Sequence, residues 1–432
     1  MVHFHIVTLF PDFFTSPLST SLMGKAQENG IVNVSFHDPR LFTTDKHHHV
    51  DDRPYGGGPG MVMQGAPLAA AIRSIANPGR MLLLSPAGRP LTQAMVRTLA
   101  EETNLTLVCG RYEGIDARLL RLFPLEPVSI GDMVLNGGEC AALSLMEAVA
   151  RLLPGFMGKE LSGEEESFSH GLLEYPHFTR PEELEGLRVP DVLLHGDHGR
   201  IREWRRKEAL RTTAEIRPDM LSTAPLTETD AKDLHALPRI RPGRNLSFCL
   251  LHYPVLLDAK KIGASSLTNL DIHDISRISC SYGMGVYYIV TPLMDQLYVL
   301  QKVLSHWTNS GGSGHSDRAR ALSYVKAAQS LDEAMDHMTK QYGVRPRLVV
   351  SSASWPHKNS QRERRMLTPQ HVREWCTQGP VMLCLGTAQG IAPQLFEQCD
   401  GILRPLRFLG YNHLSVRSAA AILADRILGD FY

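Results

Sequence analysis

The sequence predicts an α/β protein with at least two domains, on three observations. Short apolar runs occur at residues 3–10, 81–84 and 105–109, and each is followed by a segment with helical periodicity. This alternation is typical of βα units around a parallel sheet. Runs of the same kind begin again after residue 245, and a chain of 432 residues exceeds the usual size of one domain.

The first half is predicted to alternate strands and helices over residues 1–157. The run HFHIVTLF at residues 3–10 indicates a buried strand, and Pro11 and Asp12 mark a helix start after it. Residues 90–102 are expected to form a helix between the strands at 81–84 and 105–109. Residues 141–153 predict a strongly apolar helix that ends at Pro154 and Gly155.

A change of composition follows this domain. Residues 158–172 are polar and acidic, with three consecutive glutamates at 164–166, so we expect a mobile linker there. Helix signals dominate residues 173–237, which are predicted to form a small helical domain. Residues 238–245 (PRIRPGRN) contain two prolines, a glycine and three arginines, and they predict a second linker.

Residues 246–432 are predicted to form a second α/β domain. It begins with the apolar run LSFCLLHYPVL; further strands are expected at 285–291, 347–352 and 381–385, and a closing helix at 415–428. Both halves place a glycine-bearing loop after a late strand and follow it with an apolar helix rich in Ala, Ser and Leu. Two copies of one fold are therefore a hypothesis for the structure to test.

The composition is that of ordinary globular domains, with 43% hydrophobic and 21% charged residues. No stretch approaches eighteen consecutive apolar residues, and residues 1–14 lack the features of a secretory leader. The seven cysteines are odd in number and include no CxxC pair, which favours free thiols over a disulfide framework. We expect a cytoplasmic protein that does not enter a membrane.

The net charge of zero conceals two halves of opposite sign. Residues 1–240 carry 24 Lys and Arg against 31 Asp and Glu, whereas residues 241–432 carry 21 against 14. Within the acidic half, residues 200–217 hold seven basic side chains against three acidic ones. This segment is either a helix that contacts nucleic-acid phosphates or a solvated helix with i,i+4 pairs such as Glu203 with Lys207.

Four glycine-rich segments of the first half are the strongest functional signal. They lie at residues 51–61, 84–89, 109–116 and 130–139, and three of them are expected at successive strand ends. Glycine lets backbone N–H and C=O groups approach a ligand closely, so these segments indicate a nucleotide-like ligand. None contains GxxxxGK[ST] or a GxGxxG between strand and helix, which weakens the case for a nucleotide-dependent hydrolase or a Rossmann domain.

These segments resemble the bacterial tRNA (guanine-N1)-methyltransferases, the TrmD family. The matching motifs are VDDRPYGGGPGM (50–61), LSPAGR (84–89), CGRYEGID (109–116), SIGDMVLNGGE (129–139), PHFTRP (176–181) and VPDVLLHGDHGRIREWRRKEAL (189–210). The resemblance covers residues 1–235. It implies a SPOUT-type α/β domain with a trefoil knot at its C-terminal strands, followed by a linker and a helical domain, in a homodimer.

The implied activity is methyl transfer from S-adenosylmethionine to N1 of the guanine at position 37 of tRNA. The residues that match the family's cofactor loops are Leu84, Ser85, Pro86, Gly110, Tyr112, Ile130, Gly131, Leu135, Gly137 and Gly138. The expected tRNA contacts are Asp51, Glu113 and Asp116 beside the guanine, with Arg202 and Arg205 on the basic segment.

The proton chemistry is expected to depend on Glu166 and Arg151. Guanine N1 is a poor nucleophile until a base removes its proton, and a cation stabilises the charge that then develops on O6. The family's base is an aspartate in a DSF segment, and Glu166 of ESF occupies its place here, with Glu165 as the next candidate. Arg151 matches the family's arginine, although an arginine at this position also serves as an ordinary helix cap.

Other interpretations of these residues stay open. The resemblance implies dependence on Mg²⁺, which Glu113 and Glu166 would hold. The replacement of Asp by Glu is also compatible with a protein that binds RNA without catalysis. The run His47–His49 has no Cys or His at ligand spacing nearby, so a structural or RNA-facing role is favoured over a metal site.

The second half resembles the late motifs of SPOUT methyltransferases. LCLGTAQGI (383–391) matches a cofactor loop, and GYNHLSVRSAAAILADRILG (410–429) matches the segment that closes the site. The implied cofactor residues are Gly386, Gly390, Leu406, Asn412 and Ser415, with Arg417 beside them at the knot. The alternative is a degenerate domain that only binds RNA or supports dimerisation, and the basic stretch at 358–365 suits either role.

Overall fold

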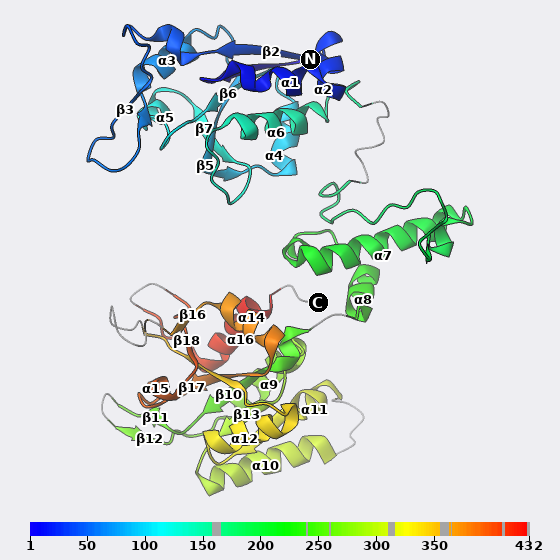
Figure 1. Ribbon diagram of the computed structural model, residues 1–432. Coiled ribbons are helices and arrows are strands. Elements are labelled where there is room, and N and C mark those ends of the chain that lie inside the picture. The colour runs from blue at the N-terminus through cyan, green and yellow to red at the C-terminus, as the bar shows by residue number, and fades with distance from the viewer. Residues whose placement is uncertain are drawn as a thin grey trace. The chain divides into compact units, whose positions relative to one another are not determined.

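The computed structural model describes residues 1–157, 166–238, 241–258, 261–309, 316–354, 363, 365–407 and 411–429 (Figure 1). They divide into two compact units, residues 1–174 and 175–432. Glu165, the second candidate base, and all of the basic stretch 358–365 except positions 363 and 365 lie outside the described residues. No described helix is long and apolar enough to cross a membrane.

The first unit contains a five-stranded parallel sheet in the order β2-β1-β6-β5-β7. The strands are β1 (Val2–Val7), β2 (Val32–His37), β5 (Arg80–Pro90), β6 (Asn104–Cys109) and β7 (Leu125–Ser129). The helices are α1 (Thr15–Ser19), α2 (Ser21–Glu28), α3 (Gly65–Arg73), α4 (Gln93–Ala100), α5 (Leu119–Leu122) and α6 (Glu139–Ala150), with 3-10 turns at Pro11–Phe14 and Pro39–Phe42. The predicted α/β class is confirmed.

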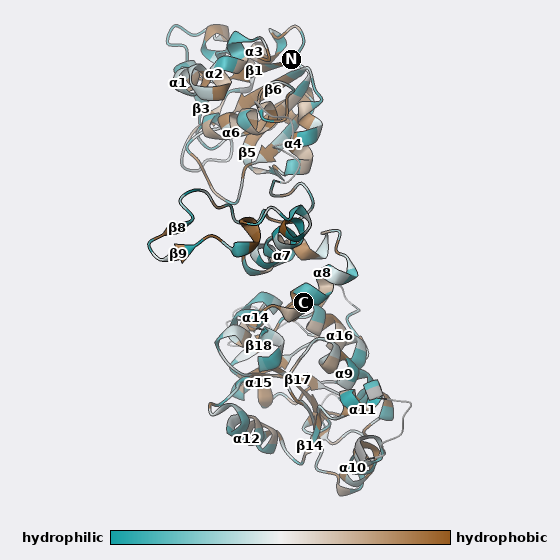
Figure 2. Ribbon diagram, turned by 90° about the vertical axis from the view of Figure 1, so that its right-hand side faces the viewer, coloured by the Kyte–Doolittle hydropathy of each residue, from teal (hydrophilic) through white to brown (hydrophobic). Residues whose placement is uncertain are grey.

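Apolar side chains cover both faces of this sheet. Successive residues of a strand point to opposite faces, so Phe4 and Ile6 of β1 join one core cluster and Val7 joins another. Helix α6 belongs to the first cluster and buries seven of its twelve residues, among them Leu145 and Met146. Figure 2 shows the apolar residues gathered on the strands. This packing holds the carboxyl ends of the strands at one rigid edge of the sheet.

Strand β5 is longer than the sequence predicted. A glycine-rich loop was expected at 84–89, but β5 runs from Arg80 to Pro90. Its pairing with β7 shifts register between Leu84 and Arg89, where both residues lie beside Val128. Residues 85–88 therefore bulge out of the strand, and a Cβ on Gly88 would lie 2.3 Å from the backbone nitrogen of Val128. The segment is an anchored bulge rather than a free loop.

Residues 175–238 form the short hairpin β8 (Glu183–Leu184) and β9 (Leu187–Arg188), followed by α7 (His198–Ile216) and α8 (Glu228–Ala236). Asp197 caps α7 by accepting hydrogen bonds from the backbone N–H groups of Gly199 and Arg200. Arg206 of α7 pairs with Asp230 of α8 at 2.9 Å, and this contact holds the pKa of Asp230 at about 2. The two helices are thus joined by a strong charged contact.

The C-terminal half contains a parallel sheet in the order β14-β13-β10-β17-β15-β18-β16. Its strands are β10 (Leu246–Leu251), β13 (Tyr287–Val290), β14 (Val325–Ala328), β15 (Arg347–Ser351), β16 (Met366–Leu367), β17 (Val381–Gly386) and β18 (Gly401–Leu403). The helices are α9 (Asn269–Ser281), α10 (Met294–Asn309), α11 (Ser316–Leu322), α12 (Leu331–Tyr342), α14 (Pro369–Gln378), α15 (Leu395–Gln398) and α16 (Val416–Leu428). A small hairpin, β11 (Val255–Leu256) with β12 (Ile262–Gly263), follows β10.

The two large sheets share one topology. The order β13-β10-β17-β15-β18 repeats the order β2-β1-β6-β5-β7 strand for strand along the chain, and the second sheet adds β14 and β16 at its edges. In each sheet the last strand is followed by a buried helix, α6 or α16. This agreement supports the hypothesis that the halves are two copies of one fold.

Candidate functional site

Three of the predicted cofactor loops meet at one edge of the first sheet. The backbone N–H of Gly138 donates to the carbonyl of Gly110 at 2.9 Å, and the backbones of Arg111 and Gly137 form an isolated antiparallel β-bridge. A Cβ on Gly138 would lie 2.7 Å from Cα of Cys109 and 3.1 Å from Cβ of Leu84. Leu84 of β5, the end of β6 and the start of α6 are therefore in contact, as the glycine content predicted.

The third loop is fixed at its base and exposed at its tip. Ser129 Oγ donates to the carbonyl of Gly131 at 2.8 Å, while Gly131 has a φ of 155°, which favours glycine. Beyond it, Met133, Val134 and Leu135 expose 54%, 85% and 41% of their surface. Three consecutive exposed apolar side chains indicate a surface that a ligand or partner covers.

A buried ion pair that was not predicted from the sequence ties two of these loops together. Glu139 is 1% exposed, lies 3.0 Å from Arg111 and accepts a hydrogen bond of 2.9 Å from Thr8. The Arg111 guanidinium also lies over the ring of Phe10 at 4.4 Å. Both charged residues belong to the quoted motifs, GRYEGID and LNGGE. The presence of one basic and one acidic residue in two loops expected to converge was the sequence signal from which this ion pair could have been predicted.

The predicted guanine-contacting residues lie close together on neighbouring backbone. The short strands β3 (Asp51–Asp52) and β4 (Val62–Met63) pair with each other, and Met63 accepts a hydrogen bond from the backbone of Asp116 while donating to Gly114. Tyr112 has a φ of 57°, and burial together with its contact to Asp51 raises the pKa of its hydroxyl. Loop 110–116 is thereby held against Asp51.

Glu113 and Asp116, two of the predicted guanine-contacting residues, differ in the contacts that they make within the chain. A Cβ on Gly60 would strike Glu113 Oε1 at 2.4 Å, so Glu113 lies over the glycine-rich segment 56–60. Asp116 pairs with Arg118 at 2.6 Å, and this hydrogen bond lowers the pKa of Asp116. Asp116 is therefore ionised and oriented by its own neighbour.

Arg151 and Glu166, the two predicted catalytic side chains, contact each other. The Arg151 guanidinium forms an ion pair with Glu166, and its Nε donates to Glu166 Oε2 at 3.3 Å. The contact with Glu166 raises the pKa of Arg151. Arg151 is also the C-cap of α6, as the alternative interpretation stated. A helix rises 1.5 Å per residue, so Arg151 lies roughly 20 Å along α6 from Gly138.

The predicted tRNA-contacting arginines lie on α7. Arg202 is exposed, whereas the Arg205 guanidinium packs over the Tyr175 ring at 4.8 Å. Other basic residues of the helix pair with carboxylates, including Lys207 with Asp233 at 3.5 Å. The i,i+4 partner suggested for Lys207 was Glu203, so the structure replaces that pair with one between two helices.

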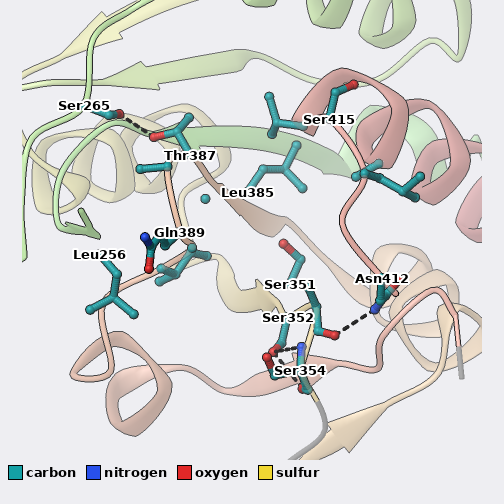
Figure 3. A pocket seen from close by; sticks show the side chains of 18 of the residues that line it. Leu256, Ser265, Ser351, Ser352, Ser354, Leu385, Thr387, Gln389, Asn412 and Ser415 are labelled. Carbon is teal, nitrogen blue, oxygen red and sulfur yellow. Dashed lines mark hydrogen bonds between the residues drawn. The ribbon is translucent and has the colours of Figure 1, made fainter. Parts of the chain in front are cut away.

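A pocket of about 600 Å³ opens in the C-terminal half, at the carboxyl ends of its strands (Figure 3). The five residues predicted there, Gly386, Gly390, Leu406, Asn412 and Ser415, all line it, as does Arg417. Asn412 donates to the carbonyl of Ala353 at 2.7 Å. Gly390 has a φ of 112° and an added Cβ would meet open space, so the loop after β17 is free of side chains there.

The inner wall of this pocket is a chain of hydrogen bonds. Thr387 donates to the carbonyl of Leu251 at 2.9 Å and accepts from Ser265, so the Ser265 oxygen is left to accept from Nδ1 of His252 at 2.9 Å. Burial lowers the pKa of His252 to about 4, which keeps the ring neutral. Ser265 and Thr387 line the pocket and are held in one orientation.

The histidine run 47–49 lies at the surface. His49 pairs with Asp45, and His48 lies 3.0 Å from the Thr43 hydroxyl. Among the residues that the structure describes, no group of three His, Cys, Asp or Glu side chains is placed to hold a metal ion.

Fold and site together define a ligand-binding α/β protein. Each parallel sheet carries glycine-rich backbone at its carboxyl edge, and in such sheets nucleotide-like ligands bind there. Residues 2–223 match the family model for tRNA (guanine-1)-methyltransferase TrmD, and residues 245–429 match that for SAM-dependent RNA methyltransferase. The chain belongs to the tRNA (guanine-1)-methyltransferase family and is a methyltransferase.

Similar curated proteins fall into two sizes. Two proteins named tRNA (guanine-N(1)-)-methyltransferase, from Oleidesulfovibrio alaskensis and Nitratidesulfovibrio vulgaris, are 56% and 55% identical to this chain. The matches span 99% of this chain and 100% and 99% of the two relatives. One from Pelotomaculum thermopropionicum is 52% identical over 237 residues, which are 54% of this chain but 94% of that protein. The matched 237 residues therefore make up almost all of that relative.

Proposed function

We propose that the first domain methylates N1 of the guanine at position 37 of tRNA, with S-adenosylmethionine as the methyl donor. The observation that carries the proposal is the convergence of Leu84, Gly110 and Gly138 in one backbone cradle. A Cβ at Gly138 would lie 2.7 Å from Cα of Cys109, so glycine is required there for the three loops to converge. The names of the full-length relatives support guanine N1 of tRNA as the methyl acceptor.

Glu166 and Arg151 divide the acid–base work. The donor, when bound, supplies a methyl group activated by its positive sulfur. Glu166 takes the proton from guanine N1, and the ring nitrogen then attacks with its freed electron pair. Arg151 orients the Glu166 carboxylate through their ion pair and donates to O6, where negative charge develops.

A homodimer is the assembly that completes this site. The Arg151–Glu166 pair lies at the C-terminal end of α6, roughly 20 Å from the cradle at its N-terminal end. Proton transfer needs contact distances of about 3 Å, so one chain in this conformation does not unite base and cradle. A second copy that brings its pair to the first copy's cradle does, and the exposed Met133, Val134 and Leu135 provide apolar surface for it.

The base is tested with a matched pair of variants. Unmodified tRNA with guanine at position 37 is incubated with labelled S-adenosylmethionine, and the product nucleoside is identified by mass. Glu166→Gln keeps the size of the side chain but cannot take the proton, so we expect a loss of about a hundredfold or more. Glu166→Asp restores the family's residue and keeps activity. Equal activity of Glu166→Gln and the wild type would remove Glu166 from the mechanism.

Complementation tests the shared site. Glu166→Gln lacks the base and Gly138→Ala lacks the cradle, so each variant alone is inactive. In a mixed dimer, one site combines an intact cradle with an intact base from the other chain. Random mixing then restores about a quarter of wild-type activity. No restoration in purified mixed dimers would place both functions in the same chain.

Further features of the first domain rest on the resemblance and stay proposals. We assign tRNA binding to Arg202 and Arg205 of α7, supported by their positive charge and their place in the matched region. The trefoil knot, the cytoplasmic location and a requirement for Mg²⁺ are likewise expected from the family. Removal of divalent cations before the tRNA assay tests the last of these.

For the C-terminal domain, we propose binding of S-adenosylmethionine in the 600 Å³ pocket. Its volume lies in the range of roughly 300–1,000 Å³ usual for ligand sites, and it has the glycine loop and polar wall that such a ligand needs. The match of residues 245–429 to a SAM-dependent RNA methyltransferase model supports it. The alternative domain, which only binds RNA, would have lost this site.

Binding stoichiometry separates these alternatives. Calorimetry with S-adenosylhomocysteine is expected to give two equivalents per chain, one for each domain. An alanine at Gly386 would put its Cβ 2.6 Å from a side-chain carbon of Ile391 and distort the pocket loop. Gly386→Ala should therefore lose one equivalent, whereas one equivalent in the wild type would support a degenerate second domain.

A further inference from the structure

The C-terminal pocket contains a charged pair that its sequence motifs did not predict. Asp271 is the third residue of α9, is 6% exposed and lines the pocket. Its Oδ2 accepts a hydrogen bond of 2.6 Å from Thr268, and its Oδ1 lies 3.4 Å from Nη1 of Arg417, which also lines the pocket. A carboxylate and a guanidinium thus stand side by side at the wall of the ligand site.

A second carboxylate on the solvent side completes the arrangement. Asp274 Oδ2 lies 3.5 Å from Nε of Arg417, is 45% exposed and is not among the residues that line the pocket. Arg417 is therefore held between one buried and one exposed carboxylate. The pair with Asp274 fixes the arginine from behind, while Asp271 faces the pocket with it.

This arrangement differs from the charged pair at the start of the equivalent helix in the first domain. Arg417 is the second residue of α16, and the second residue of α6 is Cys140. At the start of α6 the first domain instead pairs Glu139 of the helix with Arg111 of the loop after β6, and at the far end of α6 it pairs Arg151 with Glu166. The two domains share a strand order but place their charges differently, which indicates that the second pocket has its own chemistry.

The pair matches one edge of a nucleobase. A carboxylate accepts a hydrogen bond, and a neighbouring guanidinium donates one. Guanine and uracil present the complementary arrangement, a ring N–H beside a carbonyl oxygen. A ring N–H of this type is also far more acidic than a ribose hydroxyl, so a carboxylate suffices as its base. The excess of 21 basic over 14 acidic residues in this half favours a nucleic acid as the carrier of the base.

We propose that the C-terminal domain is a second RNA methyltransferase that acts on a ring N–H of guanine or uracil, with Asp271 as the base and Arg417 as the ligand of the adjacent carbonyl oxygen. The proposal rests on the binding of S-adenosylmethionine by this pocket. The N–H bond breaks and its proton goes to Asp271, and the ring nitrogen forms a bond to the methyl carbon. The carbon–sulfur bond breaks with its electron pair on sulfur, which leaves S-adenosylhomocysteine.

The test uses the full chain with Glu166→Gln, so that the first site is silent. RNA from cells that lack this gene is the acceptor, and methylated nucleosides are identified by mass. We compare Asp271→Asn with Asp274→Asn, because both remove one carboxylate from Arg417 but only the first lines the pocket. Calorimetry with S-adenosylhomocysteine is run on each variant, and thermal melting confirms that each is folded.

We expect a nucleoside methylated at guanine N1 or uracil N3, reduced about a hundredfold or more by Asp271→Asn and changed less than about threefold by Asp274→Asn. Both variants should still bind two equivalents of S-adenosylhomocysteine. Loss of one equivalent in Asp271→Asn would make Asp271 a cofactor ligand and overturn its role as base. Equal loss of product in both variants, or methylation at carbon, at ribose or at a nitrogen without a proton, would also overturn it. If the parent chain binds only one equivalent, the cofactor site itself has failed.

Discussion

The buried Arg111–Glu139 pair gives the sharpest test of how the first site is held together. Glu139→Gln keeps the side-chain volume and an oxygen that accepts the hydrogen bond from Thr8, but it removes the negative charge opposite Arg111. Two unit charges about 4 Å apart attract by about 4 kcal/mol at an effective dielectric constant of about 20. Because the Arg111 side chain is 22% exposed, water compensates part of this loss. We expect a destabilisation of about 3 kcal/mol, at the low end for a broken buried pair.

The assay must report on residues 1–174 alone. No tryptophan occurs in that unit, so tryptophan fluorescence would report unfolding of the rest of the chain only. Hydrogen exchange of peptides that cover β1, β6 and α6 is suitable, because exchange through opening of the unit accelerates with the loss of its stability. A loss of about 3 kcal/mol corresponds to about a hundredfold faster exchange in these peptides, with no change in peptides beyond residue 246.

Glu126→Gln is the matched control. Glu126 pairs with Arg80 at 2.8 Å on the same sheet, but its side chain is 45% exposed. An exposed pair contributes less than about 1 kcal/mol, so exchange should accelerate about fivefold at most. The reasoning fails if Glu139→Gln exchanges like the wild type, or if the two variants accelerate exchange equally.

The remaining predictions follow from other contacts. Burial and mutual repulsion lower the pKa values of His3 and His37, so the unfolded chain binds more protons than the native state and stability falls as pH drops below about 6.5. His37→Asn should flatten the acid side of a pH series of thermal melting curves. Asp230 has a native pKa of about 2 against 3.8 when unfolded, so its stabilising contact with Arg206 is present above about pH 4 and is lost as pH falls toward 2. The rate of proteolysis between α7 and α8 at graded pH measures this loss. The Asp230→Asn variant should be cleaved readily even at neutral pH. Gly138→Ala places a Cβ 2.7 Å from the backbone of β6, and it should weaken S-adenosylhomocysteine binding by the first domain at least tenfold in calorimetry while the second equivalent binds normally.

Burial explains which strands could be predicted from the sequence. The predicted strands include β1, β5 and β6 of the first sheet, and all three lie in its interior with neighbours on both sides. Strands β2 and β7, which are the two edges, were not predicted. An edge strand is covered less completely, so its residues need not form a continuous apolar run: β2 has the sequence VNVSFH with one fully buried residue. In the first sheet, continuous hydrophobicity therefore identifies the central strands and not the two edges.

The candidate sites divide in the same way. Close approach of backbone requires glycines, and the glycine motifs lie where Leu84, Gly110 and Gly138 meet and along the C-terminal pocket. Charged pairs leave weaker traces, because Arg111 and Glu139 are 28 residues apart and meet only through the strand order. Asp271 stands in the first turn of a helix behind Thr268, where an acidic residue is ordinary capping chemistry. Its functional meaning depends on the pocket wall that it shares with Arg417.

The positions of the two charged pairs along equivalent helices imply different dependence on assembly. In the first domain the proposed catalytic pair, Arg151 and Glu166, is separated from Gly138 by the length of α6, so the proposed site needs two copies of the chain. In the second domain Arg417 lies in the first turn of α16 and lines the pocket together with Asp271, so the proposed site needs one chain only. Dilution below the dimer dissociation constant should therefore abolish formation of 1-methylguanosine at tRNA position 37 while the C-terminal activity per chain is retained. Methylation by both sites that declines together on dilution would mean that the second site, too, needs a partner.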